Sequence, residues 1–235
     1  MDLKIKDIAE LLNVSVTTIR RWLVDKKIPA YRLNRQYRFS RAEIEDWLIQ
    51  QKLGATLDQE EKEQVIDEKK HDRAVQSGNM QFSLYRAVYR GEVLVDVPGE
   101  TKEEVVRWTM HHMATRFDLD PDVLTDLFLD REKMMPTALN HGIGAPHTRD
   151  FLLDTHYDVV TVVYPRQSIE YGALDGEPVH TLFFLFACED ARHLNLLAKL
   201  AHLSANEKTR AFFRTKPSKE RFLDFVKHWE NTLND

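Results

Sequence analysis

The chain has 235 residues, of which 43% are hydrophobic and 30% charged, and its formal net charge is -5 at pH 7. This length suits one large domain or two modest ones, and the composition is that of an ordinary globular protein. No apolar run approaches the roughly 20 residues of a membrane-spanning helix, and the N-terminus lacks the apolar core of a signal peptide. We therefore expect a cytoplasmic protein with no membrane partner. The single cysteine, Cys188, excludes an intramolecular disulfide and is predicted to be a buried, inert thiol.

Charge is unevenly distributed along the chain. Residues 1–54 hold 11 Lys and Arg against 7 Asp and Glu, whereas residues 55–235 hold 22 against 31. Between residues 15 and 41, eight basic residues accompany the single acidic residue Asp25. A basic block on a small domain is typical of nucleic-acid contact, although basic faces also occur on domains that bind no nucleic acid.

Two short helices are predicted near the N-terminus. Apolar residues recur at helical spacing over residues 5–12, and Asn13 can end this helix in a left-handed cap. Ser15 is a suitable N-cap for a second helix over residues 16–27, which turns Ile19, Trp22 and Leu23 inward. Two helices joined by about three residues form a helix-turn-helix.

The second helix and the segment after it carry the side chains that we expect to contact DNA. The N-terminal part of a recognition helix reaches phosphates and base edges in the major groove. Residues 28–39 then read as two short strands around a turn at 34–36, which makes a basic hairpin. The candidate DNA-binding residues are Thr17, Thr18, Arg20 and Arg21 on the helix and Arg35 and Arg38 on the hairpin.

A third helix is predicted over residues 41–51, with Ser40 and Glu43 as a capping box. Its Ile44, Trp47 and Leu48 share one face. The order of elements, together with the run Leu-Asn-Val-Ser-x-x-Thr-Ile-Arg-Arg-Trp, resembles the excisionase and MerR-type DNA-binding domains over about 50 residues. The resemblance implies a mainly α winged helix-turn-helix domain at residues 1–53 that binds double-stranded DNA. A small helical interaction domain with a solvated basic face is the alternative.

Residues 54–79 are rich in Asp, Glu, Lys and Gln, and we interpret them as a charged linker. They sustain no heptad of apolar positions, so a long dimerising coiled coil is not supported. If the protein is a homo-oligomer, its contacts must lie elsewhere.

From residue 80 the pattern is that of an α/β domain. Thr101 and Glu104 form a capping box that opens a helix, and Asp120-Pro121 opens another over residues 122–130. The nearly continuous apolar run at residues 182–186 suits a sheet covered on both faces. Strands are predicted at 93–97, 158–164 and 179–187, and further helices at 191–204, 207–214 and 218–229. In the helix after Thr101, we expect Val105, Val106, Trp108 and Met113 to pack inward and His111 and His112 to lie on the surface.

Residues 131–149 hold the strongest chemical signal. Two glycines and two prolines precede or flank His147, which favours an irregular, positioned loop. An imidazole can attack phosphorus through one ring nitrogen while a hydrogen bond holds the other, and Arg131 or Arg149 can neutralise the phosphoryl oxygens. The chain has ten histidines, however, and an ordinary polar role is the alternative for each.

This loop resembles the phosphorylation segment of the type-2 enzyme IIA domains (fructose, mannitol and nitrogen class) of the bacterial phosphotransferase system. The resemblance covers about residues 80 to 230 and includes the turn at 174–179 and the apolar strand after it. Several loop positions depart from the family pattern. The matching residues are Arg131-Glu132, Thr137, Gly142, Pro146-His147, His193-Leu194 and Leu197-Ala198, and the departures are Pro136, Ala138, Asn140, Gly144-Ala145 and Thr148.

The resemblance implies an α/β domain at residues 80–235, with a mixed sheet flanked by helices. It implies that His147 accepts a phosphoryl group from an HPr-like phosphocarrier protein, that Arg131 stabilises charge, and that His193 orients the group. The apolar Met134 and Met135 beside the loop could form a docking patch for the carrier, although core packing explains them equally well. Such transfer needs alignment and charge stabilisation, so we expect no cofactor and no metal.

We therefore interpret the chain as a bacterial transcription regulator that responds to phosphorylation, and as a phosphoryl-transfer protein more than an independent enzyme. Two alternatives stay open. One is a phosphocarrier that passes phosphate to a sugar permease, although the sequence contains no permease or enzyme IIB segment. The other is a degenerate enzyme IIA domain that binds proteins and is never phosphorylated, which the loop departures keep open.

Overall fold

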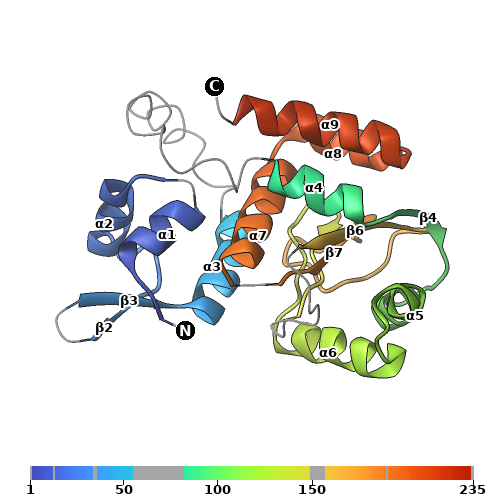
Figure 1. Cartoon of the computed structure of the whole chain (residues 1–235), viewed down its shortest axis with the longest axis horizontal. Helices are drawn as coiled ribbons and strands as arrows, with labels where there is room; N and C mark the ends of the chain where they lie inside the picture. The colour runs from blue at the N-terminus through green and yellow to red at the C-terminus, as the bar shows by residue number, and fades with distance from the viewer. Residues whose placement is uncertain are drawn as a thin grey trace.

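The computed structural model describes residues 2–12, 14–33, 36–54, 82–148, 157–188 and 190–233. The predicted cap Asn13, the turn residues Asn34 and Arg35, nearly all of the predicted linker, and Arg149 lie outside the described residues. Figure 1 shows a helix-turn-helix unit beside a larger unit built on a sheet. Among the described helices, none is long and apolar enough to cross a membrane.

The N-terminal unit has the predicted order of helix, helix, hairpin and helix. Its three-stranded antiparallel sheet has the order β1-β3-β2, with Leu3 opposite Phe39. Strand β1 was not predicted from the sequence. The elements are β1 (Asp2–Leu3), α1 (Ile5–Leu11), α2 (Val16–Val24), β2 (Tyr31–Leu33), β3 (Gln36–Ser40) and α3 (Arg41–Gly54).

Helix α2 is shorter than predicted. Ser15 caps it as expected by accepting a hydrogen bond from the backbone N–H of Thr18. The helix ends at Val24 because Lys26 adopts a positive φ of 54°, where a right-handed helix cannot continue. Apolar spacing does not encode this turn, and therefore the predicted end at residue 27 was wrong.

The C-terminal unit contains a four-stranded mixed sheet in the order β4-β6-β7-β5, as the fold prediction required. Strands β6 and β7 are antiparallel, while β4 pairs with β6 and β5 pairs with β7 in parallel. Its elements are α4 (Ser83–Arg90), β4 (Val93–Val97), α5 (Lys102–Phe117), α6 (Pro121–Met134), β5 (Ile143–Gly144), β6 (Val159–Pro165), β7 (Thr181–Phe186), α7 (Asp190–Ala205), α8 (Glu207–Arg214) and α9 (Lys219–Thr232).

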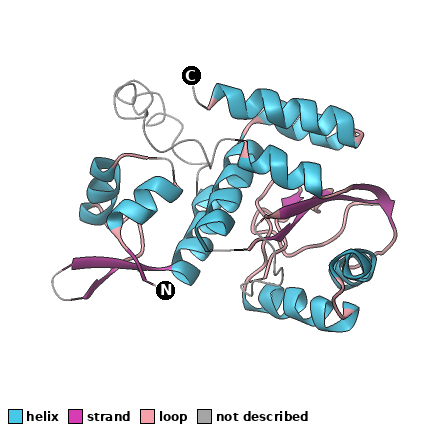
Figure 2. Cartoon of the chain, viewed as in Figure 1, coloured by secondary structure: helices cyan, strands magenta, loops and turns pink. Residues whose placement is uncertain are grey.

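Helices cover both faces of this sheet (Figures 1 and 2). Helices α5 and α6 pack on the face that carries Val159 and Val163 of β6, and α4, α7, α8 and α9 pack on the face that carries Val160 and Val162. Successive residues of a strand point to opposite faces, so a strand between two helical layers must be apolar throughout. This explains the continuous apolar run that the sequence shows in β7.

Three predictions in this unit need correction, and two elements were missed. Trp108 is 38% exposed and stacks on His112, because it lies outside the helical arc of buried residues that includes Met110. Glu104 does not complete the capping box, since its carboxylate accepts from the N–H of Glu100. Cys188 is only half-buried. Helix α4 and strand β5 were not predicted.

Gly91 shows how tightly α4 packs on the sheet. A Cβ atom at this position would clash with the carbonyl group of Val160 and lie 2.6 Å from its carbon. Both partners are backbone, so we expect Gly91→Ala to destabilise the protein by about 3 kcal/mol, the upper range for overpacking. The control is Gly176→Ala, where the space is open and only the positive φ of 70° opposes the substitution, by about 1 kcal/mol. Equal midpoints of urea unfolding for the two variants would contradict the prediction.

Candidate functional site

The loop between α6 and β6 begins at a buried carboxylate. Glu132, in the last turns of α6, accepts hydrogen bonds from the backbone N–H and the hydroxyl of Thr137. Burial raises the pKa of Glu132, and the two hydrogen bonds from Thr137 oppose that rise. Glu132 therefore fixes the point at which the chain leaves the helix and enters the loop.

The loop then makes a tight left-handed turn. Asn140, His141 and Gly142 all have positive φ, at 60°, 54° and 76°. The N–H of Leu139 donates to the carbonyl of Ile143 at 2.7 Å across the turn. Asparagine tolerates this conformation better than other residues with a side chain, so Asn140 preserves the turn although it departs from the glycine of the family pattern.

His147 lies where the loop joins the sheet. The carbonyl of Pro146 accepts from the N–H of Leu185 in β7 at 3.0 Å, and His147 forms an isolated bridge with Leu185. Its ring Nδ1 donates to the carbonyl oxygen of Ala145 at 2.8 Å. The ring is therefore held by the backbone through Nδ1, and Nε2 is the nitrogen directed away from the loop. The side chain is fully buried.

His193, in the first turn of α7, meets His147 at this point. The two ring centroids are 5.0 Å apart and the planes are inclined by 61°. His193 is 1% exposed. Two histidines that are 46 positions apart in the chain therefore lie side by side, and their shared role in one site stays a prediction.

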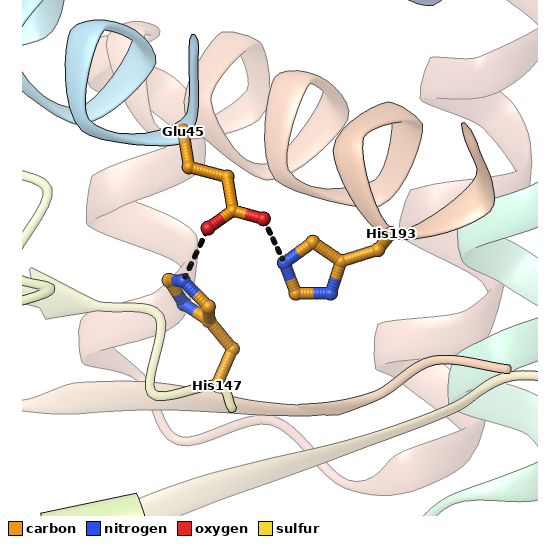
Figure 3. Close-up of side chains that lie close together, drawn as sticks. All are labelled: Glu45, His147 and His193. Carbon is orange, nitrogen blue, oxygen red and sulfur yellow. Dashed lines mark ion pairs between the residues drawn. The ribbon is translucent and has the colours of Figure 1, made fainter. Parts of the chain in front are cut away.

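A carboxylate from the N-terminal unit lies between the two imidazoles. Figure 3 shows Glu45, which projects from α3, with one oxygen directed at each ring. Its Oε1 is 3.4 Å from Nε2 of His193, and its Oε2 is 3.9 Å from Nε2 of His147. Nε of Arg41, one helical turn earlier, pairs with Oε1 at 2.7 Å. The Glu45 side chain is fully buried. A buried carboxylate needs cationic or hydrogen-bonding partners, and the neighbouring Arg41 and the two histidines can provide them.

Arg131 also reaches the N-terminal unit. Its Nη2 is 3.1 Å from Oδ1 of Asp46, and its Nη1 donates to the carbonyl of Met135 at 3.0 Å. The side chain of Arg131 is 3% exposed. The structure therefore places His147 and His193 next to each other. Arg131 is connected to them indirectly, because it pairs with Asp46, and the adjacent Glu45 on α3 lies beside both histidines.

Among the residues that the structure describes, two groups of side chains have donor atoms close enough to hold a metal ion. The first is Glu45, His147 and His193, whose ligand atoms lie within 4.8 Å of one another. The second is His141, Asp175 and Glu177, in which Asp175 already accepts from the backbone N–H of His141. The sequence spacing had indicated neither group.

Comparison with known proteins identifies the C-terminal unit. Residues 89–229 match the model of the family described as phosphoenolpyruvate-dependent sugar phosphotransferase system, EIIA 2. The chain belongs to this family. Residues 3–52 match a helix-turn-helix domain model, so the chain joins a helix-turn-helix domain to an EIIA 2 domain.

The relatives share the EIIA 2 part. The chain is 30% identical over 144 residues to a nitrogen regulatory protein of Pseudomonas aeruginosa, a match that covers 60% of this chain and 92% of that protein. It is 24% identical over 148 residues to the PTS system fructose-specific EIIABC component of Bacillus subtilis, covering 57% of this chain but only 21% of that protein. The crystal structure of nitrogen regulatory protein IIA-Ntr from Neisseria meningitidis has the same fold, with a TM-score of 0.52 at 22% identity, over 57% of this chain and 91% of that one.

Three residues at the EIIA 2 site were not predicted, namely Arg41, Glu45 and Asp46. They belong to the helix-turn-helix domain, on α3. A buried glutamate on a helix has the same sequence pattern as an exposed one, and only the docking of one domain on another distinguishes them. Of the predicted carrier-docking pair, Met134 is 68% exposed and Met135 is partly buried against the core.

Those predicted DNA-binding residues that the structure describes lie on α2 and β3, and Figure 1 shows α2 on the side of the helix-turn-helix domain away from the EIIA 2 domain. Thr17, Arg20 and Arg21 are exposed on α2. Thr18 is partly buried, and its hydroxyl and N–H both bond to the side chain of Ser15. Arg38 on β3 donates to Gln36 and to the carbonyl of Tyr37.

Proposed function

We propose that this protein is a phosphorylation-responsive DNA-binding regulator of the phosphotransferase system. His147 accepts a phosphoryl group from the phosphohistidine of an HPr-like carrier, and the phosphorylation state of His147 controls the helix-turn-helix domain. The observation that carries the proposal is that α3 of the helix-turn-helix domain packs directly on the histidine pair of the EIIA 2 domain. Chemistry at His147 therefore cannot leave the contact between the domains unchanged.

The geometry suits transfer to Nε2 of His147. Because Nδ1 donates its proton to the carbonyl of Ala145, the neutral ring carries its lone pair on Nε2. Nε2 attacks phosphorus, a new N–P bond forms, and the N–P bond to the carrier's imidazole breaks. No metal is needed for this exchange, since the transfer depends on alignment and on stabilisation of the equatorial oxygens. In this proposal, His193 donates a hydrogen bond to the phosphoryl group and Arg131 stabilises its charge.

Intact mass measurement tests the acceptor chemistry. The full chain is incubated for hours with phosphoenolpyruvate, enzyme I and HPr, which together generate the phosphorylated carrier. We expect an adduct of about 80 Da, the mass of one phosphoryl group, that is lost in acid as an N–P bond is. An unmodified mass with a donor system that phosphorylates a known enzyme IIA would contradict the proposal.

DNA binding is tested by charge removal on α2. We expect Arg20→Ala to weaken binding to a duplex by about tenfold at low salt, because this exposed guanidinium would no longer neutralise a phosphate. The slope of log affinity against log salt concentration should decrease by about 0.9 for each phosphate that the variant leaves unneutralised. Arg221→Ala is the matched control, since Arg221 is an exposed arginine of α9. If the two variants weaken binding equally in a gel shift, α2 is not the DNA-contacting helix.

A further inference from the structure

The two domains are held together by side-chain contacts as well as by the covalent linker. Helices α1 and α3 both pack against α7. Leu194, the residue after His193, is fully buried in the apolar core of the helix-turn-helix domain, together with Ile8 and Ile44. The ion pair between Arg131 and Asp46 adds a polar contact at the same interface. The helix-turn-helix domain thus packs on the part of the EIIA 2 domain that holds His147 and His193.

The side chain at the centre of this domain interface is a carboxylate. Glu45 presents its two carboxylate oxygens to His147 and His193, as Figure 3 shows, and Arg41 pairs with one of them. A phosphoryl group on Nε2 of His147 would present oxygens to the same imidazoles. The gap of 3.9 Å between that nitrogen and Oε2 cannot hold a phosphorus atom together with its oxygens. Glu45 and a phosphoryl group therefore exclude each other by volume as well as by charge.

Charge favours this assignment over a metal site. The donor set of one carboxylate and two imidazoles is of a kind that Zn²⁺ accepts. However, the guanidinium of Arg41 pairs with Oε1 at 2.7 Å, and a second cation beside it would be repelled. The guanidinium of Arg41 and the two imidazoles together provide hydrogen-bond donors and positive charge, which stabilise a bound anion.

We propose that Glu45 is a latch that occupies the phosphoryl position of His147 and holds the helix-turn-helix domain over the site. This inference rests on the proposed function and specifies its regulation. The latched form shields Nε2 of His147 from any donor, so phosphorylation requires the domain to move away, and the phosphorylated site cannot be latched again. The exposed Thr17, Arg20 and Arg21 remain accessible in the latched form, so unphosphorylated protein can bind DNA as one rigid body.

The latch is tested on the full chain with two variants and a control. Glu45→Ala removes the carboxylate, and Asp46→Ala breaks the ion pair with Arg131 without changing any side chain that faces His147. Glu43→Gln is the matched control, because Glu43 is an exposed carboxylate on the same helix. Circular dichroism and thermal unfolding establish that each variant is folded before it is compared.

The first readout is the reaction of His147 with diethyl pyrocarbonate, which acylates accessible imidazole nitrogens, followed by peptide mass analysis. We expect His147 to react at least tenfold faster in Glu45→Ala than in the wild type, to react at an intermediate rate in Asp46→Ala, and to be as protected in Glu43→Gln as in the wild type. Equal rates in the wild type and Glu45→Ala would overturn the latch. This readout does not depend on phosphorylation.

The second readout is the initial rate of phosphorylation by phosphoramidate, a small donor that needs no docking surface. We expect the same order of variants, with Glu45→Ala at least tenfold faster than the wild type. If Glu45→Ala is reactive to diethyl pyrocarbonate but is never phosphorylated, the proposed function fails while the shielding of His147 stands. Titration with Zn²⁺ completes the test: one tightly bound ion in the wild type that is absent from Glu45→Ala would overturn the assignment of Glu45 as a phosphoryl surrogate.

Discussion

Replacement of His147 by alanine is expected to abolish the acid-labile phosphoryl adduct of the full chain. His147 presents Nε2 at the histidine pair, and its Nδ1 is held by the carbonyl of Ala145. Alanine offers no nucleophile, so the adduct should be absent at every donor concentration. Intact mass and acid lability measure the result.

Two further histidine variants make this expectation specific. His193→Ala should slow phosphorylation by about a hundredfold without abolishing it, since it removes one positioned hydrogen-bond donor but not the acceptor. His228→Ala should leave the adduct unchanged, because His228 is exposed on α9. An adduct that survives in His147→Ala but disappears in His193→Ala would exchange the two roles.

The variant His147→Ala also tests whether phosphorylation is coupled to DNA binding. Phosphorylation adds about -1.5 to -2 charges at neutral pH, by analogy with phosphate monoesters, at the position that the carboxylate of Glu45 occupies in the unphosphorylated protein. We expect donor treatment to change the DNA affinity of the wild type and to leave that of His147→Ala unaffected. If both proteins respond equally, the effect of the donor does not pass through His147.

Glu230→Ala is expected to destabilise the EIIA 2 domain by about 3–5 kcal/mol, as for a broken buried ion pair. Glu230, at the end of α9, is 1% exposed. Its carboxylate accepts from the N–H groups of Leu84 and Tyr85 at 3.1 and 2.9 Å and from Nζ of Lys199 at 2.6 Å. The alanine variant would remove the carboxylate that pairs with the largely buried Lys199 and leave the first turn of α4 without its acceptor.

Glu230 acts as the cap that α4 lacks locally. Phe82 precedes α4 with a positive φ of 56° and makes no side-chain capping bond. Burial lowers the pKa of Lys199, and the charge of Glu230 and its hydrogen bond to Lys199 oppose that effect, so Glu230 stabilises the charged form of the lysine. Thermal unfolding should show a decrease in Tm of about 10 °C for a domain of this size. Glu220→Ala, on the exposed side of the same helix, should change Tm by no more than about 2 °C. Similar decreases for both would show that Glu230 has no special role.

The sequence predicted those parts of the fold that depend on local chemistry. Asp120 caps α6 as predicted, by accepting from the N–H groups of Asp122 and Val123, because an aspartate before a proline encodes this start within a few residues. The apolar run of β7 indicated a strand buried on both faces. His147 and His193 were paired through the resemblance to enzyme IIA domains, and the structure places them next to each other.

Parts of the fold that depend on distant contacts were not predictable in this way. Helix α4 has only eight residues, and the carboxylate that caps it is 146 positions later in the chain. Isolated helices of this length are unstable in water, so tertiary packing must stabilise α4. Glu45 escaped prediction for a related reason, since its burial arises only when one domain docks on the other.

Leu194 gives the contact between the domains a second consequence. It belongs to the EIIA 2 domain by sequence and to the core of the helix-turn-helix domain by packing. Separation of the domains would place this leucine in water at a cost of about 1.5–3 kcal/mol. A second copy of the chain can offset that cost by seating its own helix-turn-helix domain on the vacated surface, an exchange of identical parts between molecules. Domain opening would then depend on protein concentration, and the amount of this protein in the cell would become an input alongside its phosphorylation.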